Sequence, residues 1–192
     1  MRIVGAIGVF SLCVFGVVAG AEPVSNAEAK AQLFSLKGRE VELIPRYWLT
    51  PDNAALVEQV AEQQLYYAAI AASPDDGILN PATIAAANDH TMDVARAKAL
   101  SACDAAKRGQ AACEIVAMVR PRNFEPVELT LSHGATEAWR KSYRRVRGEK
   151  AFAISPTVGA FIVATGEGAA SAALSACAEQ AQTDDCLIVI QD

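Results

Sequence analysis

Short sequence motifs that occur twice in the same order constrain the fold of this chain more than any other feature. The matches comprise V-E-L, A-[IF]-A-x-S-P, the pentapeptide ALSAC and C-x-I-V. In the first copy they begin at residues 41, 69, 99 and 113, and in the second at 127, 151, 173 and 186. Because self-similarity in a fixed order is typical of repeated structural units, we predict a tandem duplication.

The repeats define the expected organisation of the chain. We predict a first repeat at 41–119 and a second at 127–192, joined by a linker at 120–126. A lead-in segment at 22–40 precedes the first repeat, and residues 1–21 have the composition of a signal peptide.

The N-terminal segment indicates export. Arg2 is followed by an apolar run from Ile3 to Val18 and by Ala-Gly-Ala at 19–21, so we expect cleavage before Glu22. We find no second apolar segment of membrane-spanning length, so we expect no transmembrane anchor after cleavage. The sequence therefore predicts an exported protein, either periplasmic or secreted.

Cysteine usage agrees with this location. Cys13 would leave with the signal peptide, and the remaining four cysteines would enter an oxidising compartment where disulfides persist. Four cysteines allow three connectivities. The nearly equal spacing within the two repeats favours pairs inside each repeat, namely Cys103 with Cys113 and Cys177 with Cys186.

Local signals predict an α+β fold in which helices cover antiparallel sheets. Each repeat fits the order β-α-β-β-α-β, which is also the order of ferredoxin-like units. Thr50 and Pro51 begin an expected helix at 51–64, and its counterpart at 135–146 carries an apolar stripe of Ala135, Trp139, Tyr143 and Val146. The expected strands are 41–43, 66–72, 83–87 and the C-x-I-V segment in the first repeat, and 127–129, 151–155, 160–165 and the C-x-I-V segment in the second. We expect the second helix of each repeat to end at Cys103 or Cys177, with the leucine of ALSAC facing the core.

The second repeat, AFAISPTVGAFIVATGEGAASAALSACAEQAQTDDCLIVI, resembles an uncharacterised family of small exported bacterial domains that contain disulfides. The resemblance covers about 40 residues of that repeat and is weaker in the first, whose loops are longer. It implies a bacterial origin, an exported location and paired cysteines. It implies no activity and no catalytic residue.

The two histidines are the main candidates for chemistry. Asp89, His90 and Asp93 offer three ligands that suit a divalent metal, although the same residue types are common at the start of a helix. His133 follows Ser132, which suggests an activated nucleophile, but a serine before a helix is first of all an N-cap. We favour the capping interpretation for both histidines and predict no catalytic residue, no bound metal and no cofactor.

A basic run is the strongest charged feature in a chain whose net charge is −5. The basic side chains lie on an expected helix and just after it, where they complement the helix dipole or bind an anionic partner. They are Arg140, Lys141, Arg144, Arg145, Arg147 and Lys150. Because Trp139 and Tyr143 are expected to be buried, we predict no nucleic-acid binding.

These observations favour a non-catalytic exported protein that binds an envelope component, a protein partner or a small ligand. The expected site is a groove between the two repeats or the basic helix. The alternative is an envelope hydrolase or a metal-dependent enzyme that uses His90 or His133. A third possibility is a purely structural domain. The sequence does not indicate the oligomeric state.

Overall fold

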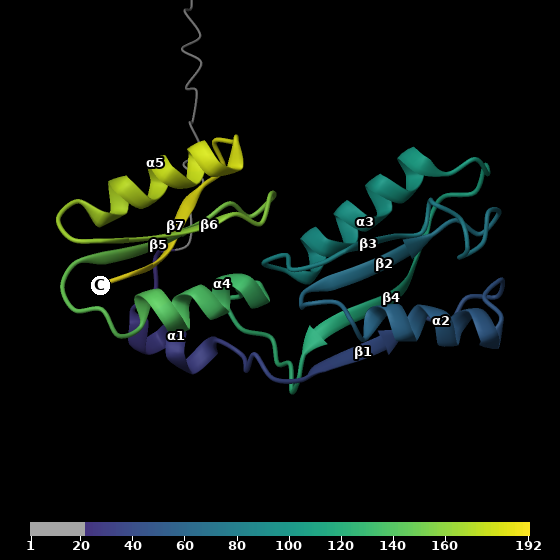
Figure 1. Cartoon of the computed structure of the whole chain (residues 1–192), viewed down its shortest axis with the longest axis horizontal. Coiled ribbons are helices and arrows are strands. Elements are labelled where there is room, and N and C mark those ends of the chain that lie inside the picture. Colours follow the sequence, from purple (N-terminus) through teal and green to yellow (C-terminus); the bar gives the residue numbers. More distant parts are fainter. Residues whose placement is uncertain (1–21) are drawn as a thin grey trace, which may run out of the picture.

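The computed structural model describes residues 22–192, which form two units that each contain an antiparallel sheet with helices on both faces (Figure 1). The first unit has the strand order β1-β4-β2-β3. Its elements are β1 (Arg39–Leu43), α2 (Pro51–Ala61), β2 (Ala68–Ala72), β3 (Ile84–Ala86), α3 (Met92–Ala106) and β4 (Glu114–Pro121). This unit has the predicted β-α-β-β-α-β order.

The second unit has the strand order β6-β5-β7. Its elements are α1 (Asn26–Gln32), α4 (His133–Ala138), the π-helical segment η1 (Trp139–Tyr143), β5 (Lys150–Ile154), β6 (Phe161–Thr165), α5 (Ala169–Ala181) and β7 (Leu187–Gln191). The predicted strand at 127–129 is wrong. Leu129 instead inserts its side chain into the core of this unit, and Val24 forms a parallel bridge with Ile190 of β7.

The predicted α+β class, with helices covering antiparallel sheets, is therefore confirmed. The expected signal peptide, including Cys13, lies outside the described residues. Within residues 22–192, no helix combines the length and the apolar character needed to cross a bilayer.

The two faces of β2 meet different helices because side chains alternate along a strand. Ile70 belongs to the core cluster on the α2 face, whereas Ala69 and Ala71 belong to the cluster on the α3 face. Alanines at these positions and on α3 let the helix approach the sheet closely.

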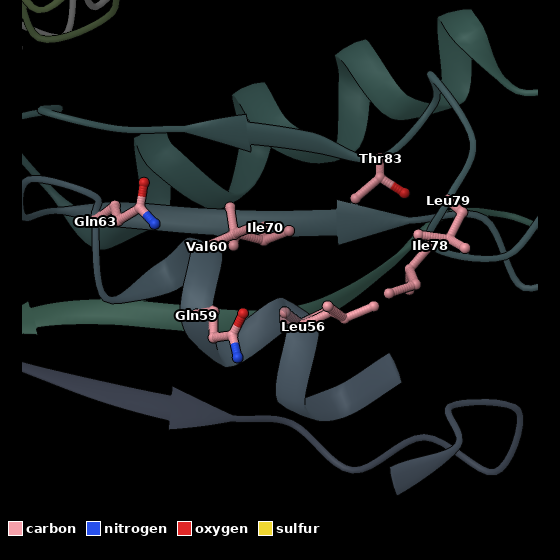
Figure 2. Close-up of a pocket in the computed structure, with 9 residues that line it drawn as sticks. Leu56, Gln59, Val60, Gln63, Ile70, Ile78, Leu79 and Thr83 are labelled. Carbon is pink, nitrogen blue, oxygen red and sulfur yellow. The ribbon is translucent and has the colours of Figure 1, made fainter. Parts of the chain in front are cut away.

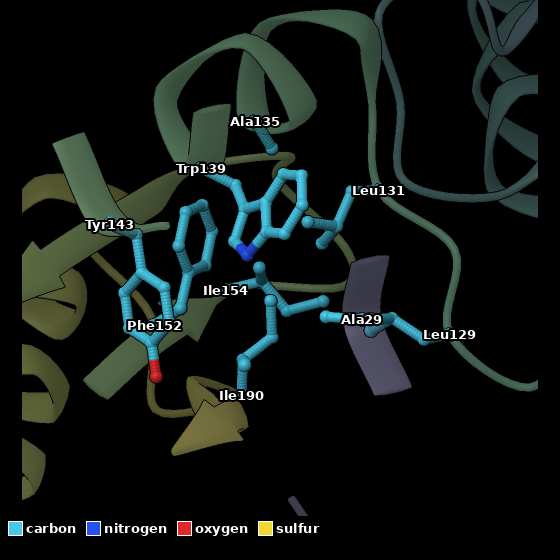
Figure 3. Close-up of a cluster of buried hydrophobic side chains, with 9 residues drawn as sticks. All are labelled: Ala29, Leu129, Leu131, Ala135, Trp139, Tyr143, Phe152, Ile154 and Ile190. Atoms are coloured by element: carbon cyan, nitrogen blue, oxygen red, sulfur yellow. The ribbon is translucent and has the colours of Figure 1, made fainter. Parts of the chain in front are cut away.

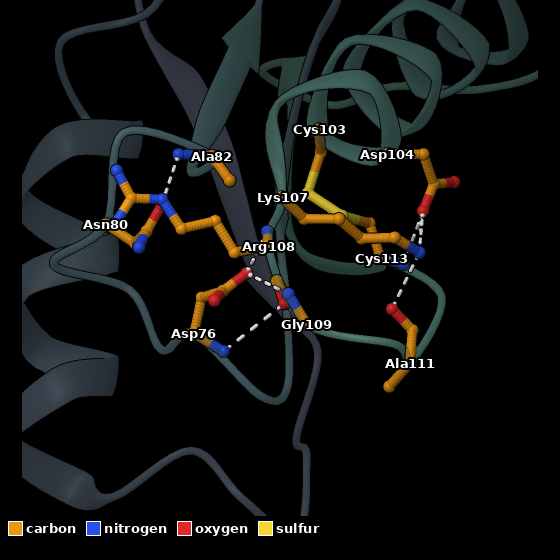
Figure 4. The surroundings of a disulfide bond; sticks show 11 residues. Asp76, Asn80, Ala82, Cys103, Asp104, Lys107, Arg108, Gly109, Ala111 and Cys113 are labelled. Carbon is orange, nitrogen blue, oxygen red and sulfur yellow. Dashed lines mark hydrogen bonds and ion pairs between the residues drawn. A yellow bond between two sulfur atoms is a disulfide. The ribbon is translucent and has the colours of Figure 1, made fainter.

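Both predicted disulfides are present. Cys103 is bonded to Cys113 and Cys177 to Cys186, with a Cα–Cα distance of 6.1 Å in each pair. Figure 4 shows the first bond in the last turn of α3, and the Asp76 carboxylate accepts hydrogen bonds from the N–H groups of Arg108 and Gly109 in the loop that follows. Two disulfides suit an oxidising, non-cytoplasmic compartment.

The expectation that each helix ends at its first disulfide cysteine is wrong. The helix α3 continues to Ala106 and α5 continues to Ala181. The cysteine and the first alanine of each ALSAC copy are buried, whereas Leu100 and Leu174 are only partly buried. Residues four positions apart lie on one helix face, so alanine and cysteine form the contact with the sheet.

Aromatic side chains fill the core of the second unit on the α1 and η1 face. Ala135, Trp139 and Tyr143 are buried, as the apolar stripe predicts, and Figure 3 shows the two rings together with Phe152 of β5. The predicted stripe extends too far, because the helix ends near Tyr143 and Val146 is half-buried.

Candidate functional site: an apolar groove beside helix α2

The first unit contains an apolar cavity, which we call the α2 groove. Its volume is about 270 Å³, and it lies between α2, strand β2 and the loop before β3. The residues that line it are Leu56, Val57, Gln59, Val60, Gln63, Ile70, Ile78, Leu79 and Thr83. In Figure 2, Leu56 on α2 and Ile78 in the loop extend toward each other.

The groove exists because α2 covers only part of its sheet face. This helix begins at Pro51, and the Thr50 side chain caps it by accepting a hydrogen bond from the Asn53 N–H at 3.3 Å. The helix packs on β1, β4 and β2. The sheet surface near β3 is left open, and the loop at 78–83 forms the far wall of the groove.

Large apolar side chains at the groove are in contact with water. Leu79 is 84% exposed, Val60 46% and Leu56 42%. Exposure of apolar surface to water is energetically unfavourable. A contiguous exposed apolar patch that lines a cavity is therefore typical of a binding site. None of the nine lining residues is ionisable, so the groove suits a neutral ligand.

One buried polar atom lies at the groove. Among the described residues, the Thr83 hydroxyl oxygen has no hydrogen-bond partner although it is shielded from solvent. A buried hydroxyl without a partner is energetically unfavourable, and Thr83 lines the groove, so a ligand whose polar hydrogen reaches this oxygen would satisfy it.

Protein contacts join the two units in the region where the sequence predicts a groove between the repeats. His90 Nδ1 accepts a hydrogen bond from the Ser132 N–H at 3.1 Å, and Nε2 donates to the Ala160 carbonyl at 3.2 Å. The Gly134 N–H donates to Asn88 Oδ1 at 2.8 Å. A broad hollow of about 560 Å³ lies along α3, but the second unit contributes only Thr157 to its lining.

His90 has a structural role in this region. It is 1% exposed, and burial lowers its pKa below the ordinary value of 6.5, against the raising effect of its hydrogen bond with Ala160. Both ring nitrogens are used in contacts between the units, which leaves neither for a metal. Asp89 forms an ion pair with Lys98, and the Asp93 side chain is exposed. No trio of His, Cys, Asp or Glu within residues 22–192 is arranged to hold a metal ion, so the structure does not bring Asp89, His90 and Asp93 together as ligands.

The helix caps next to both histidines agree with the capping interpretation. Thr91 caps α3, and Ser132 caps α4 by accepting a hydrogen bond from the Ala135 N–H at 3.1 Å. The ring of His133 packs against Tyr66, and its Nε2 lies 3.2 Å from the Leu36 carbonyl oxygen. The structure therefore does not pair Ser132 with His133 as a nucleophile and its base.

The six basic residues do not form one surface. Lys150 is only 5% exposed and forms an ion pair with Asp192 at 3.3 Å. Arg140 donates to the Phe34 carbonyl at 3.1 Å, and Lys141 pairs with Glu137 at 2.6 Å. Arg144 lies over the Trp139 ring. Arg145 and Arg147 are exposed, so the predicted six-residue patch is reduced to a smaller basic surface.

Sequence reasoning missed the residues of the α2 groove, although one signal was present. Leu56 and Val60 stand beside Val57 and Ala61 on the same helix, and this apolar stripe is wider than the buried face requires. Leu79 is a second signal, since it is apolar in a loop rich in Asp, Asn and Pro.

Comparisons with known protein families, with curated proteins and with solved structures found no match for this chain.

Proposed function

We propose that this protein is an exported, non-catalytic binding protein, periplasmic or secreted, that takes up a neutral apolar ligand in the α2 groove. The observation that carries the proposal is the cavity itself, in which six of nine lining residues are apolar and none is charged. The two disulfides and the composition of residues 1–21 support export.

Among the ligand classes expected from the sequence, the geometry favours a small ligand. A cavity of about 270 Å³ lies just below the usual range for ligand sites, which is roughly 300 to 1,000 Å³, so only a small ligand fits. The alternative, an enzyme centred on His90 or His133, gains no support, because His90 is buried and both histidines contact backbone carbonyls.

A titration of methyl-labelled protein with 1-octanol tests the proposal. We expect chemical shift changes at Leu56, Val60 and Ile70 on addition of the alcohol, while the methyl groups of Ile154 and Ile190 in the second unit stay unchanged. The first three residues line the groove, whereas the last two lie in a closed core.

A matched pair of variants locates the site. Val60→Glu places a carboxylate at the groove and should weaken octanol binding by at least about tenfold, since an apolar ligand would then bury a charge. Ala55→Glu puts the same charge on an exposed position of α2 outside the groove and should leave binding unchanged. Equal effects of the two substitutions, or no shifts at the groove with either octanol or an aromatic ligand, would count against the proposal.

A further inference from the structure

Strands β2 and β5 correspond to each other in detail. Each precedes a Ser-Pro pair, at Ser73 and Ser155. Each pairs with two neighbours, and each shows a register shift at the same point of its motif, after Ile70 in β2 and after Phe152 in β5. Ile70 and Phe152 therefore occupy equivalent positions on equivalent sheet faces.

The helices that precede these strands also correspond. Trp139 lies as far before Ser155 as Val57 lies before Ser73, and the same holds for Tyr143 and Ala61. All four side chains are buried on the sheet face that carries Ile70 or Phe152. The equivalence thus extends from the strand to the helix that covers it.

At each of these positions the first unit has the smaller side chain. In the first unit, Val57 is equivalent to Trp139, Ala61 to Tyr143, Ile70 to Phe152 and Ala72 to Ile154 of the second unit. Figure 3 shows the second unit's aromatic rings packed together above β5. The first unit lacks these rings, and the α2 groove lies at the same place, with Val57 and Ile70 in its lining.

Hydrogen bonding extends the comparison. In the second unit the indole N–H of Trp139 donates to Asn26 Oδ1 at 3.1 Å. In the first unit the buried Thr83 hydroxyl has no partner among the described residues, and Gln59 and Gln63 place amide groups in the lining. An aromatic molecule with one polar hydrogen would occupy the volume and supply the missing hydrogen bond.

We propose that the α2 groove binds a small, neutral aromatic molecule with a polar hydrogen, of the indole or phenol class. The ligand takes the place that the protein's own rings occupy in the second unit, and its polar hydrogen is donated to Thr83. This inference rests on the proposed function, because it specifies the ligand class of the same groove.

Titrations with indole, indene and 1-octanol distinguish the proposed aromatic ligand class from the proposed binding of apolar ligands in general. Indene has the shape of indole without the N–H, and octanol is neutral but linear. We expect indole to shift the groove methyl groups and to bind about threefold to tenfold more tightly than indene, which is the effect of one hydrogen bond. Thr83→Val should remove this difference while indene binding stays the same.

Ile70→Phe introduces the side chain that the second unit carries at the equivalent position, Phe152. The added ring should fill the groove and abolish indole binding. Leu79→Asp at the exposed edge provides a second test that does not disturb the core, since Leu79 is largely exposed. Ala106→Phe, on an exposed residue of α3 that lies on the other face of the sheet, is the matched control and should bind indole normally.

The outcomes distinguish the inference from the function on which it rests. Octanol shifts without indole or indene shifts would overturn the aromatic class and leave an apolar binding site. An absence of groove shifts with all three ligands would overturn both proposals. Undiminished indole binding by Ile70→Phe and Leu79→Asp, or equal binding of indole and indene, would also overturn the aromatic inference as stated.

Discussion

The neutral imidazole of His90 joins the two units because it donates at one nitrogen and accepts at the other. A protonated ring carries hydrogens on both nitrogens, so Nδ1 would then face the Ser132 N–H as a second donor. Burial lowers the pKa of His90 and keeps the ring neutral in the folded protein. The charged form is therefore less favoured in the folded protein than in the unfolded chain.

This difference predicts a pH-dependent stability. Because the folded pKa lies below the unfolded value of about 6.5, the unfolded state binds more protons at and below that pH. The free energy of unfolding should therefore fall as the pH drops below about 6.5, by up to about 1.4 kcal/mol per pH unit. Urea unfolding at several pH values measures the slope.

Two substitutions test whether His90 causes the pH dependence of the free energy of unfolding. His90→Gln removes the titrating group and should flatten the dependence between pH 6.5 and 5, even if it lowers stability at every pH. His133→Gln is the control and should keep the slope of the wild-type protein. A slope that survives in the first variant and disappears in the second would contradict the assignment to His90.

Single residues that act locally were predictable from the sequence. Thr50 and Ser132 cap helices as expected, because a cap depends only on the next three residues. The groove residues were not predicted. Leu56 and Val60 are as apolar as their buried neighbour Val57, and only the position of α2 over β1 and β4 determines which of them meets water.

At the scale of elements, each disulfide links a helix to the start of the strand that follows it. In each unit an aspartate also forms hydrogen bonds between the loop that contains the disulfide and the turn after the central strand. Asp76 in the turn after β2 accepts hydrogen bonds from the Arg108 and Gly109 N–H groups, at 3.0 and 3.2 Å. In the second unit the acceptor is in the cysteine loop instead, where Asp185 accepts from the Ser155 hydroxyl at 2.7 Å. The cysteine spacing indicated the pairing, but these contacts between distant loops left no local pattern.

Removing either disulfide should destabilise its unit by a similar amount. Each bond closes a short loop, so the chain-entropy argument gives a loss of about 2.5 to 3 kcal/mol for Cys103→Ser with Cys113→Ser, and the same for Cys177→Ser with Cys186→Ser. Urea unfolding of the two double variants measures the loss. A loss near zero in one pair would show that its loop is held by other contacts, such as those of Asp76 or Asp185.

At the scale of the whole molecule, the chain order and the spatial order differ. The lead-in segment precedes the first unit in sequence but packs on the second, where Ala29 is buried in the core and the Gln32 side chain accepts a hydrogen bond from the Leu129 N–H at 2.8 Å. The sequence indicated a separate segment at 22–40 but not its location. Contacts between residues this far apart depend on the complete fold and have no periodicity to detect.

The lead-in contacts predict that the two units respond differently to an N-terminal deletion. The chain has two tryptophans, and Trp48 packs in the first unit whereas Trp139 is buried in the second. Without residues 22–33 the second unit loses the apolar contacts of Val24, Ala29 and Leu33, so it should be destabilised by about 3 kcal/mol. Urea unfolding is followed by tryptophan fluorescence in Trp48→Phe, which retains Trp139 of the second unit, and in Trp139→Phe, which retains Trp48 of the first, each with and without the deletion. The transition reported by Trp139 should move to lower urea while that of Trp48 changes little, and equal shifts of both would instead show that the contacts through His90 make the two units unfold together.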